Sequence, residues 1–339
     1  MIKIKPGWLK ITTIDMHTGG EPLRIFIDGL PEIPGSTILK KRRYFRDHLD
    51  HIRTGTMWEP RGHADMYGAI ITEAVNKGSD FGTFFLHNEG YSTMCGHAII
   101  ALTKYVLESG IVTKDGDEPV IKIDAPPGLI TAKALRSGDR VKKVSFLNVP
   151  SFLLHKDEFV EVEGLGKVKF DVAYGGAFYA ICEAGPLGLK LDESNYYQLI
   201  DAGRKIKHAV MDRFEIRHPF EEELSFLYGT IFTGKALDPS HHSRNVCIFA
   251  DGEVDRSATG TGVSARAALH HAKGELKIGE KLTIESILGT TMDVEVKEIL
   301  KYGPHDAVIP EVTGTAFFTG KNEFWFDPED SLVKGFVLR

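Results

Sequence analysis

The chain has 339 residues, of which 42% are hydrophobic and 26% are charged, and its formal net charge is −6. This length suggests about two domains of ordinary globular composition, and the negative charge disfavours nucleic acid as a partner, because phosphates require a basic face. No apolar run reaches the ~20 residues of a membrane span, and the first residues lack the apolar core of a secretory signal.

Short strands separated by Gly, Pro and Asp dominate the chain. Strands are predicted, in chain order, at residues 23–27, 84–86, 120–123, 160–168, 281–284 and 292–296. Helices are predicted at residues 36–49, 98–109, 196–207, 219–224 and 263–272. This strand-rich mixture with few helices indicates the α+β class.

Two of the predicted helices have no polar face. The helix from Ala98 is apolar on all sides and the helix from Val263 is rich in small residues, so both are expected to be buried. We therefore predict two halves, each with strands around one buried helix. The first half spans residues 1–135, the second spans residues 136–313, and the strands of residues 314–339 are candidates to return to the first half.

The openings of these two helices repeat one another. Residues 94–98 read Met-Cys-Gly-His-Ala and residues 258–262 read Ala-Thr-Gly-Thr-Gly. Cys95 and Thr259 lie 164 positions apart (259 − 95), close to half of the chain, as expected when two similar domains face each other. The chemical difference between the copies is therefore a thiol in one and an alcohol in the other.

The first residues of both helices suit a small anion. A helix N-terminus presents unpaired N–H groups and a partial positive charge, and Gly96, Gly260 and Gly262 leave that backbone open to a ligand. The same position favours a thiolate and lowers a cysteine pKa. Cys95 is therefore predicted to be a base or nucleophile near neutral pH, and its alternative role is that of a buried core residue.

Thr259 limits the chemistry to one face of the ligand. Two cysteines on opposite faces could exchange protons at an α-carbon and racemise it. An alcohol is far too weak an acid to supply a matching base near pH 7, and no neighbour in the sequence is positioned to activate Thr259. The pair therefore predicts one-sided chemistry through Cys95.

The remaining cysteines and histidines give no metal or disulfide pattern. Three cysteines form no disulfide framework, and such a count fits a reducing, cytoplasmic location. Cys182 and Cys247 lie in apolar runs and are interpreted as core residues of buried strands. The histidine pairs at 241–242 and 270–271 lack metal-ligand spacing, so we expect no metal.

Six motifs occur along nearly the whole chain. They are residues 15–22, 59–63, 88–97, 174–179, 255–262 and 314–316. In this order they make the chain resemble the proline racemase family, and within it the branch of trans-3-hydroxy-L-proline dehydratases. Racemases and 4-hydroxyproline epimerases of this family have Cys where this chain has Thr259, whereas the dehydratase branch has Thr there and keeps the first Cys.

The resemblance implies a diaminopimelate-epimerase-like fold. Its two pseudo-symmetric halves are each a strand-rich barrel around a central helix, and the active site lies in the cleft between them. It also implies a hydroxyproline-like imino acid as substrate, no metal or organic cofactor, and a homodimer. The implied catalytic residues are Cys95 and Thr259, and the implied substrate contacts are Gly96, His97, Asp255, Gly260 and Thr261.

The expected reaction is a syn elimination of water. In trans-3-hydroxy-L-proline the α-hydrogen and the 3-hydroxyl lie on the same ring face, so Cys95 can remove the proton while its thiol, or a water, protonates the hydroxyl. The enamine then tautomerises to 1-pyrroline-2-carboxylate, and Thr259 hydrogen-bonds the substrate from the other face. Asp255 is expected to pair with the ring ammonium or to serve as a turn residue. His97 contacts the substrate, orients Cys95 or caps the helix.

Three alternatives remain at this stage. A proline racemase or hydroxyproline 2-epimerase is disfavoured by Thr259, and a non-catalytic imino-acid binding protein would leave Cys95 without a chemical role. A Cys/His hydrolase built on Cys95 and His97 lacks an orienting residue. In addition, positions i and i+2 at a helix start are expected to face apart.

Overall fold

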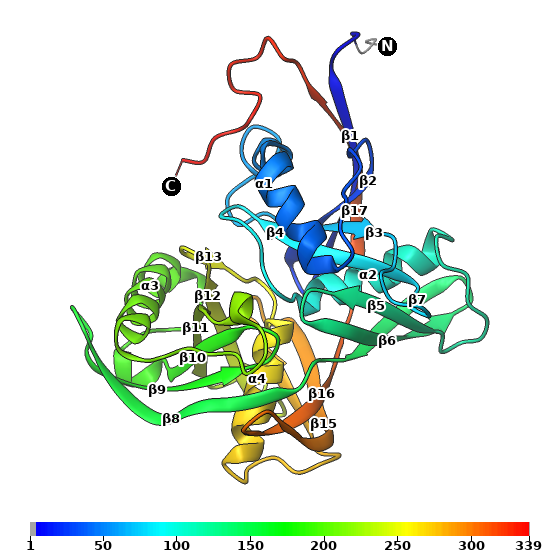
Figure 1. Cartoon of the computed structure of the whole chain (residues 1–339). Helices are drawn as coiled ribbons and strands as arrows, with labels where there is room; N and C mark the ends of the chain where they lie inside the picture. The colour runs from blue at the N-terminus through cyan, green and yellow to red at the C-terminus, as the bar shows by residue number, and fades with distance from the viewer. Residues whose placement is uncertain (1–4, 339) are drawn as a thin grey trace.

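The structure is a computed structural model and describes residues 5–338. Two lobes face each other, and each surrounds one helix with strands (Figure 1). The chain passes from the first lobe to the second after β7 and returns to the first with β17.

The first lobe contains the helix that starts after Cys95. Its strands are β1 (Leu9–Thr18), β2 (Glu21–Asp28), β3 (Tyr67–Thr72), β4 (Phe81–His87), β5 (Val120–Ala125), β6 (Gly128–Ser137), β7 (Arg140–Leu147) and β17 (Ala316–Phe326). Its helices are α1 (Ile38–Met57) and α2 (Gly96–Glu108). Only Lys104 and Glu108 of α2 are not buried, because the helix packs against strands on several sides.

The second lobe contains the helix that starts after Thr259. Its strands are β8 (Ser151–Val162), β9 (Gly166–Tyr174), β10 (Phe178–Glu183), β11 (Leu227–Gly234), β12 (Ser243–Phe249), β13 (Glu253–Val254), β14 (Lys281–Glu285), β15 (Thr291–Tyr302) and β16 (His305–Gly314). Its helices are α3 (Tyr196–Arg213) and α4 (Gly260–Ala272), with short 3₁₀ turns η1 (Gly185–Leu187), η2 (Glu193–Asn195) and η3 (Glu222–Leu224). The first ten residues of α4 are buried, so α4 occupies the same kind of position as α2.

Strand pairing joins the two lobes. β16 pairs antiparallel with both β7 and β8, so one sheet continues from lobe to lobe. β17 pairs antiparallel with β1 from Leu9 opposite Phe326 to Thr18 opposite Ala316. β6 continues past residue 135, where the first half was predicted to end, and reaches Ser137. Its partner strand β7 packs on α2, the central helix of the first lobe.

Two local predictions differ from the structure. Residues 160–168 form the end of a hairpin rather than one strand, because the chain turns between β8 and β9, where Gly164 and Gly166 have φ of +79° and +71°. The helix predicted at 219–224 is only the 3₁₀ turn Glu222–Leu224, since no apolar repeat continues beyond it. The predicted helix at 36–49 is confirmed and continues to Met57.

The two central helices meet at their N-termini. The backbone of Gly96 packs directly against that of Gly260, so the openings of α2 and α4 touch at the boundary between the lobes. Both helices begin two or three residues earlier than the apolar pattern predicts, at these glycines. The repeated segments are therefore also neighbours in space.

Candidate active site

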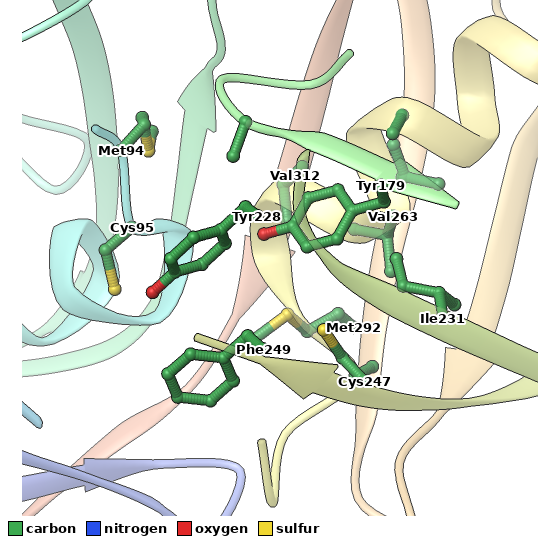
Figure 2. Packing of buried hydrophobic residues seen from close by; sticks show 14 of the residues in the cluster. Met94, Cys95, Tyr179, Tyr228, Ile231, Cys247, Phe249, Val263, Met292 and Val312 are labelled. Atoms are coloured by element: carbon green, nitrogen blue, oxygen red, sulfur yellow. The ribbon is translucent and has the colours of Figure 1, made fainter. Parts of the chain in front are cut away.

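A small cavity lies where α2 and α4 meet. Both lobes contribute to its wall, and Figure 2 shows Cys95 on one side of a group of residues from the second lobe. The structure brings all the sequence-predicted site residues to this wall: Cys95, Gly96, His97, Asp255, Thr259, Gly260 and Thr261.

Cys95 is the N-cap of α2. Its sulfur accepts a hydrogen bond from the Ala98 N–H at 3.4 Å, and its thiol lies 3.1 Å from Nδ1 of His97. The expectation that Cys95 and His97 face apart is wrong. Cys95 has an extended backbone (φ −145°, ψ 106°), so the spacing rule for helical residues does not apply to it.

The pKa of Cys95 differs from the sequence-based expectation. Burial raises this pKa well above its usual value, and the negative charges of Asp255 and Glu21 raise it further. The Ala98 N–H and a contact with the Tyr67 hydroxyl oppose this rise. The predicted lowering is wrong for the ligand-free protein, because desolvation outweighs the field of the helix N-terminus.

His97 is a neutral partner of the thiol. Burial lowers the pKa of His97 to about 3, while the Pro22 carbonyl opposes this shift. Its ring meets that of Tyr67 edge to face at 4.8 Å, and its backbone carbonyl accepts a hydrogen bond from Thr18 Oγ1 at 2.8 Å. A neutral imidazole does not form the imidazolium–thiolate pair of a cysteine hydrolase, which argues against that alternative.

Thr259 occupies the corresponding N-cap of α4 in an unusual conformation. Its φ is +66°, and its buried hydroxyl has no hydrogen-bond partner among the described residues. The turn before it is tightly held: the Ser257 N–H donates to Asp255 Oδ1 at 2.7 Å, and the Thr259 N–H donates to Ser257 Oγ at 3.1 Å. A left-handed threonine is strained, so the surrounding turn must enforce this conformation.

Asp255 places a carboxyl group in the same wall. It is 5% exposed, and burial raises its pKa, while hydrogen bonding from Ser257 and the nearby Thr259 hydroxyl oppose the rise. Its backbone N–H donates to the Cys247 carbonyl at 3.0 Å, which fixes the turn to β12. Asp255 forms no ion pair within residues 5–338, although the charge of Arg256 reaches it, and a buried carboxylate of this kind suits an incoming ammonium group.

Thr261 and the loop after β9 complete the second-lobe side. The hydroxyls of Thr261 and Tyr179 are hydrogen-bonded at 2.6 Å. A β-carbon on Gly175 would lie 2.2 Å from the Thr261 carbonyl oxygen, so this position requires glycine. The motif at residues 174–179 therefore packs against the opening of α4.

Six residues of the cavity wall were not predicted as site residues, and two of them, Met94 and Tyr179, lie within motifs singled out in the sequence. Tyr67, Tyr228 and Phe249 come from β3, β11 and β12, and the sequence gives no signal that these strands converge. Cys247 lies in the buried strand β12, as expected, but it also lines the cavity. Cys182 is buried in β10 and does not line this cavity.

Buried charges lie behind the cavity. Glu21 is fully buried, and its Oε2 accepts a hydrogen bond from the Arg256 N–H at 2.8 Å. Burial raises the pKa of Glu21 well above its usual value. His87 and Glu253 form a second buried pair at 2.8 Å, with the His87 ring stacked on Tyr67.

Within residues 5–338, no group of three His, Cys, Asp or Glu side chains is arranged to hold a metal ion. The same residues include no helix that is both long and apolar enough to cross a membrane.

The sequence and the fold were compared with known proteins. The family model for proline racemase matches residues 13–337. A trans-3-hydroxy-L-proline dehydratase of Colwellia psychrerythraea is 54% identical over 333 residues, covering 98% of this chain and 94% of that protein. A protein of the same name from Homo sapiens is 45% identical over 340 residues, covering 98% and 96%.

One solved structure extends the comparison to the fold. A hydroxyproline epimerase from Agrobacterium vitis with bound trans-4-OH-L-proline has a TM-score of 0.91 and 30% identity. The match covers 97% of this chain and 96% of that one. It confirms the predicted fold class, with two pseudo-symmetric halves that each enclose a central helix and a site between them.

Proposed function

The chain belongs to the proline racemase family, as its motifs predict, and we propose that it is a hydro-lyase that converts trans-3-hydroxy-L-proline to 1-pyrroline-2-carboxylate. The observation that carries this proposal is the pairing of Cys95 with Thr259 at the two helix openings in one cavity. One face of the substrate then meets a thiol and the other meets an alcohol.

The substrate is held by groups from both lobes. Its carboxylate binds the free N–H groups at the openings of α2 and α4, where Gly96 and Gly260 expose the backbone. Asp255 pairs with the ring ammonium and Thr259 hydrogen-bonds the substrate, which supplies a partner for its hydroxyl. His97 orients the Cys95 thiol through their 3.1 Å contact.

The reaction begins with proton removal by Cys95. The thiolate takes the α-proton, and the N–H groups around the carboxylate stabilise the negative charge that develops. The bond from C3 to its hydroxyl breaks on the same ring face, and the hydroxyl accepts a proton from an acid on that face and leaves as water. The resulting enamine takes a proton at C3 to become the cyclic imine, so the elimination needs no second base at Thr259.

Substrate binding also changes the state of Cys95. In the free protein, burial and two nearby carboxylates disfavour the thiolate. The ring ammonium brings a positive charge next to Asp255 and the thiol, which lowers the pKa of Cys95. The base is therefore generated mainly in the complex.

A direct assay tests the proposed function. Purified protein is mixed with trans-3-hydroxy-L-proline, and the cyclic imine is followed with o-aminobenzaldehyde, alongside Cys95→Ser and a Cys182→Ser control outside the cavity. We expect imine formation that Cys95→Ser loses by at least 10³-fold and that Cys182→Ser retains. Inversion of L-proline or 4-hydroxyproline without imine formation would instead support the racemase or epimerase alternative.

We also propose that the enzyme is a cytoplasmic homodimer that needs no metal or organic cofactor. The family resemblance and three free cysteines, which suit a reducing compartment, support this view. Dialysis against a chelator should leave the rate of imine formation unchanged. Light scattering should give twice the chain mass of 37.6 kDa, and a monomer would contradict the dimer.

A further inference from the structure

A second hydroxyl lies beside the Cys95 thiol. Tyr228 is the second residue of β11, and Figure 2 shows its hydroxyl pointing toward the sulfur of Cys95. Both side chains line the same cavity, and they are close enough to interact electrostatically. Tyr228 therefore lies on the thiol side of the site.

The Tyr228 hydroxyl is buried without a partner. By distance and angle it has no hydrogen-bond partner among the described residues, although the Tyr67 hydroxyl is near enough to affect its ionisation. A buried hydroxyl without a hydrogen-bond partner is destabilising. A group kept in this state at a cavity wall is suited to a ligand that completes its hydrogen bonding.

The other two tyrosines of the wall are already engaged. The Tyr67 hydroxyl is hydrogen-bonded to Ser92 Oγ, and the Tyr179 hydroxyl is hydrogen-bonded to Thr261 Oγ1. Of the three tyrosines, Tyr228 is the one whose hydroxyl has no hydrogen-bond partner among the described residues.

Neighbouring rings hold Tyr228 in place. Its ring centroid lies 5.5 Å from that of Phe249 and 6.0 Å from those of both Tyr179 and His87. The Tyr228 carbonyl accepts a hydrogen bond from the Ala250 N–H at 3.1 Å. The direction of the hydroxyl is thus fixed before any ligand binds.

We propose that Tyr228 is the acid that protonates the leaving 3-hydroxyl of the substrate. This inference rests on the proposed function, because a syn elimination requires the acid on the same ring face as the base Cys95. Tyr228 is then a catalytic residue that touches the hydroxyl while Cys95 contacts the α-hydrogen.

Cys95 and Tyr228 together account for every proton in this step. Cys95 takes the α-proton, the electron pair of that C–H bond forms the C2–C3 double bond, and the C3–O bond breaks. Tyr228 gives its proton to the departing oxygen, which leaves as water, and becomes a phenolate. The proton on Cys95 then passes to Tyr228, which restores the thiolate and the phenol.

The ionisation of Tyr228 agrees with this role. Burial raises its pKa well above the usual value, and the neighbouring Tyr179, Glu253 and Cys95 raise it further, while the Tyr67 hydroxyl opposes the rise. The phenol therefore stays protonated across the physiological range. A phenolate formed in the reaction recovers its proton from the neighbouring Cys95 thiol, which closes the cycle.

The test separates proton removal from loss of the hydroxyl. Tyr228→Phe is incubated with trans-3-hydroxy-L-proline in D₂O, and mass spectrometry follows both imine and deuterium at the α-carbon of recovered substrate. We expect imine formation to fall by about 10²- to 10⁴-fold, while deuterium accumulates in the substrate. Tyr174→Phe is the matched control, since Tyr174 is also a buried tyrosine without a hydroxyl partner but lies outside the cavity.

A second substrate tests the acid role directly. Chloride leaves without a proton, so Tyr228→Phe should eliminate chloride from trans-3-chloro-L-proline within a few-fold of the wild-type rate. Wild-type dehydration in Tyr228→Phe would overturn the inference and leave the Cys95 thiol as the acid. Equal losses of exchange, chloride elimination and dehydration would also overturn it, because Tyr228 would then only shape the site.

The proposed function is judged separately. If the wild-type protein forms no imine, the dehydratase proposal itself fails, whatever Tyr228→Phe does. If the wild type forms imine and Tyr228→Phe matches it, only the inference about Tyr228 fails.

Discussion

Gly96 and Gly260 approach each other backbone to backbone at the start of the two central helices. A β-carbon on either glycine would lie 2.6 Å from the Cα of the other. No side chain therefore separates the two helix openings. This contact fixes the spacing between the thiol face and the alcohol face of the site.

A methyl group at this contact should damage both stability and activity. Gly96→Ala forces the openings of α2 and α4 apart, and we expect a loss of about 1–3 kcal/mol in the free energy of unfolding and at least tenfold in kcat/KM. Urea denaturation and the imine assay measure the two effects. Gly185→Ala is the control, because a β-carbon there meets no atom within 4 Å. Wild-type behaviour of Gly96→Ala would contradict the close contact.

A second thiol should allow proton exchange on both faces of the substrate. Thr259→Cys places a thiol opposite Cys95 at the opening of α4, so L-proline should be converted to D-proline at a rate that chiral chromatography detects. Thr259→Ser, which keeps an alcohol, should give no D-proline. If Thr259→Cys exchanges the α-proton of L-proline without inversion, the thiol does not reach the second face.

The pH profile should report the ionisation of Cys95. Burial and the charge of Asp255 raise the pKa of this thiol above its usual value in the free enzyme. Since the thiolate is the proposed base, kcat/KM should increase with pH through the neutral and alkaline range. A profile that is flat from pH 7 to 10 would contradict Cys95 as a base of raised pKa.

Removing one negative charge should shift the pH profile of kcat/KM in a defined direction. Asp255→Asn takes away a charge that disfavours the thiolate, so the rise of kcat/KM should move to lower pH. The maximal kcat/KM should fall, because the substrate ammonium loses its proposed partner. Asp251→Asn is the control, because Asp251 is an exposed residue paired with Arg204. An unshifted rise in Asp255→Asn would show that the carboxylate does not act on the thiol.

His97 should make the fold sensitive to acid. Its pKa is about 3 in the folded protein and about 6.5 when unfolded, so it contributes stability above pH 6.5 that is lost progressively as pH falls toward 3. Between pH 7 and pH 5 this loss is about 2 kcal/mol. The difference in the free energy of unfolding between wild type and His97→Gln, measured with urea, should therefore narrow by about this amount from pH 7 to pH 5. A difference that stays constant would mean that His97 titrates normally.

The sequence predicts the parts of the site that lie together in the chain. Cys95 and Thr259 are recognisable because each opens a helix that is buried on all sides, and the repeated segments predict that these helices face each other. Tyr67 and Tyr228 are different, because they come from strands that are distant in sequence. Their convergence depends on tertiary packing, which no local pattern encodes.

Two errors in the sequence reasoning share a physical origin. The pKa of Cys95 and its orientation toward His97 both depend on the environment at the helix opening rather than on the helix itself. Desolvation there outweighs the helix field, and the extended N-cap turns the thiol toward the imidazole. Neither effect can be read from residue spacing.

The pairing of β1 with β17 ties the ends of the described chain together. Leu9 lies opposite Phe326, so the lobe that carries Cys95 acquires its last strand only after the whole second lobe has been synthesised. Contacts of such long sequence separation form slowly. Both Cys95 and Thr259 are therefore synthesised before β17 can complete the strands around α2. Activity is a property that this enzyme acquires only at the final stage of its folding.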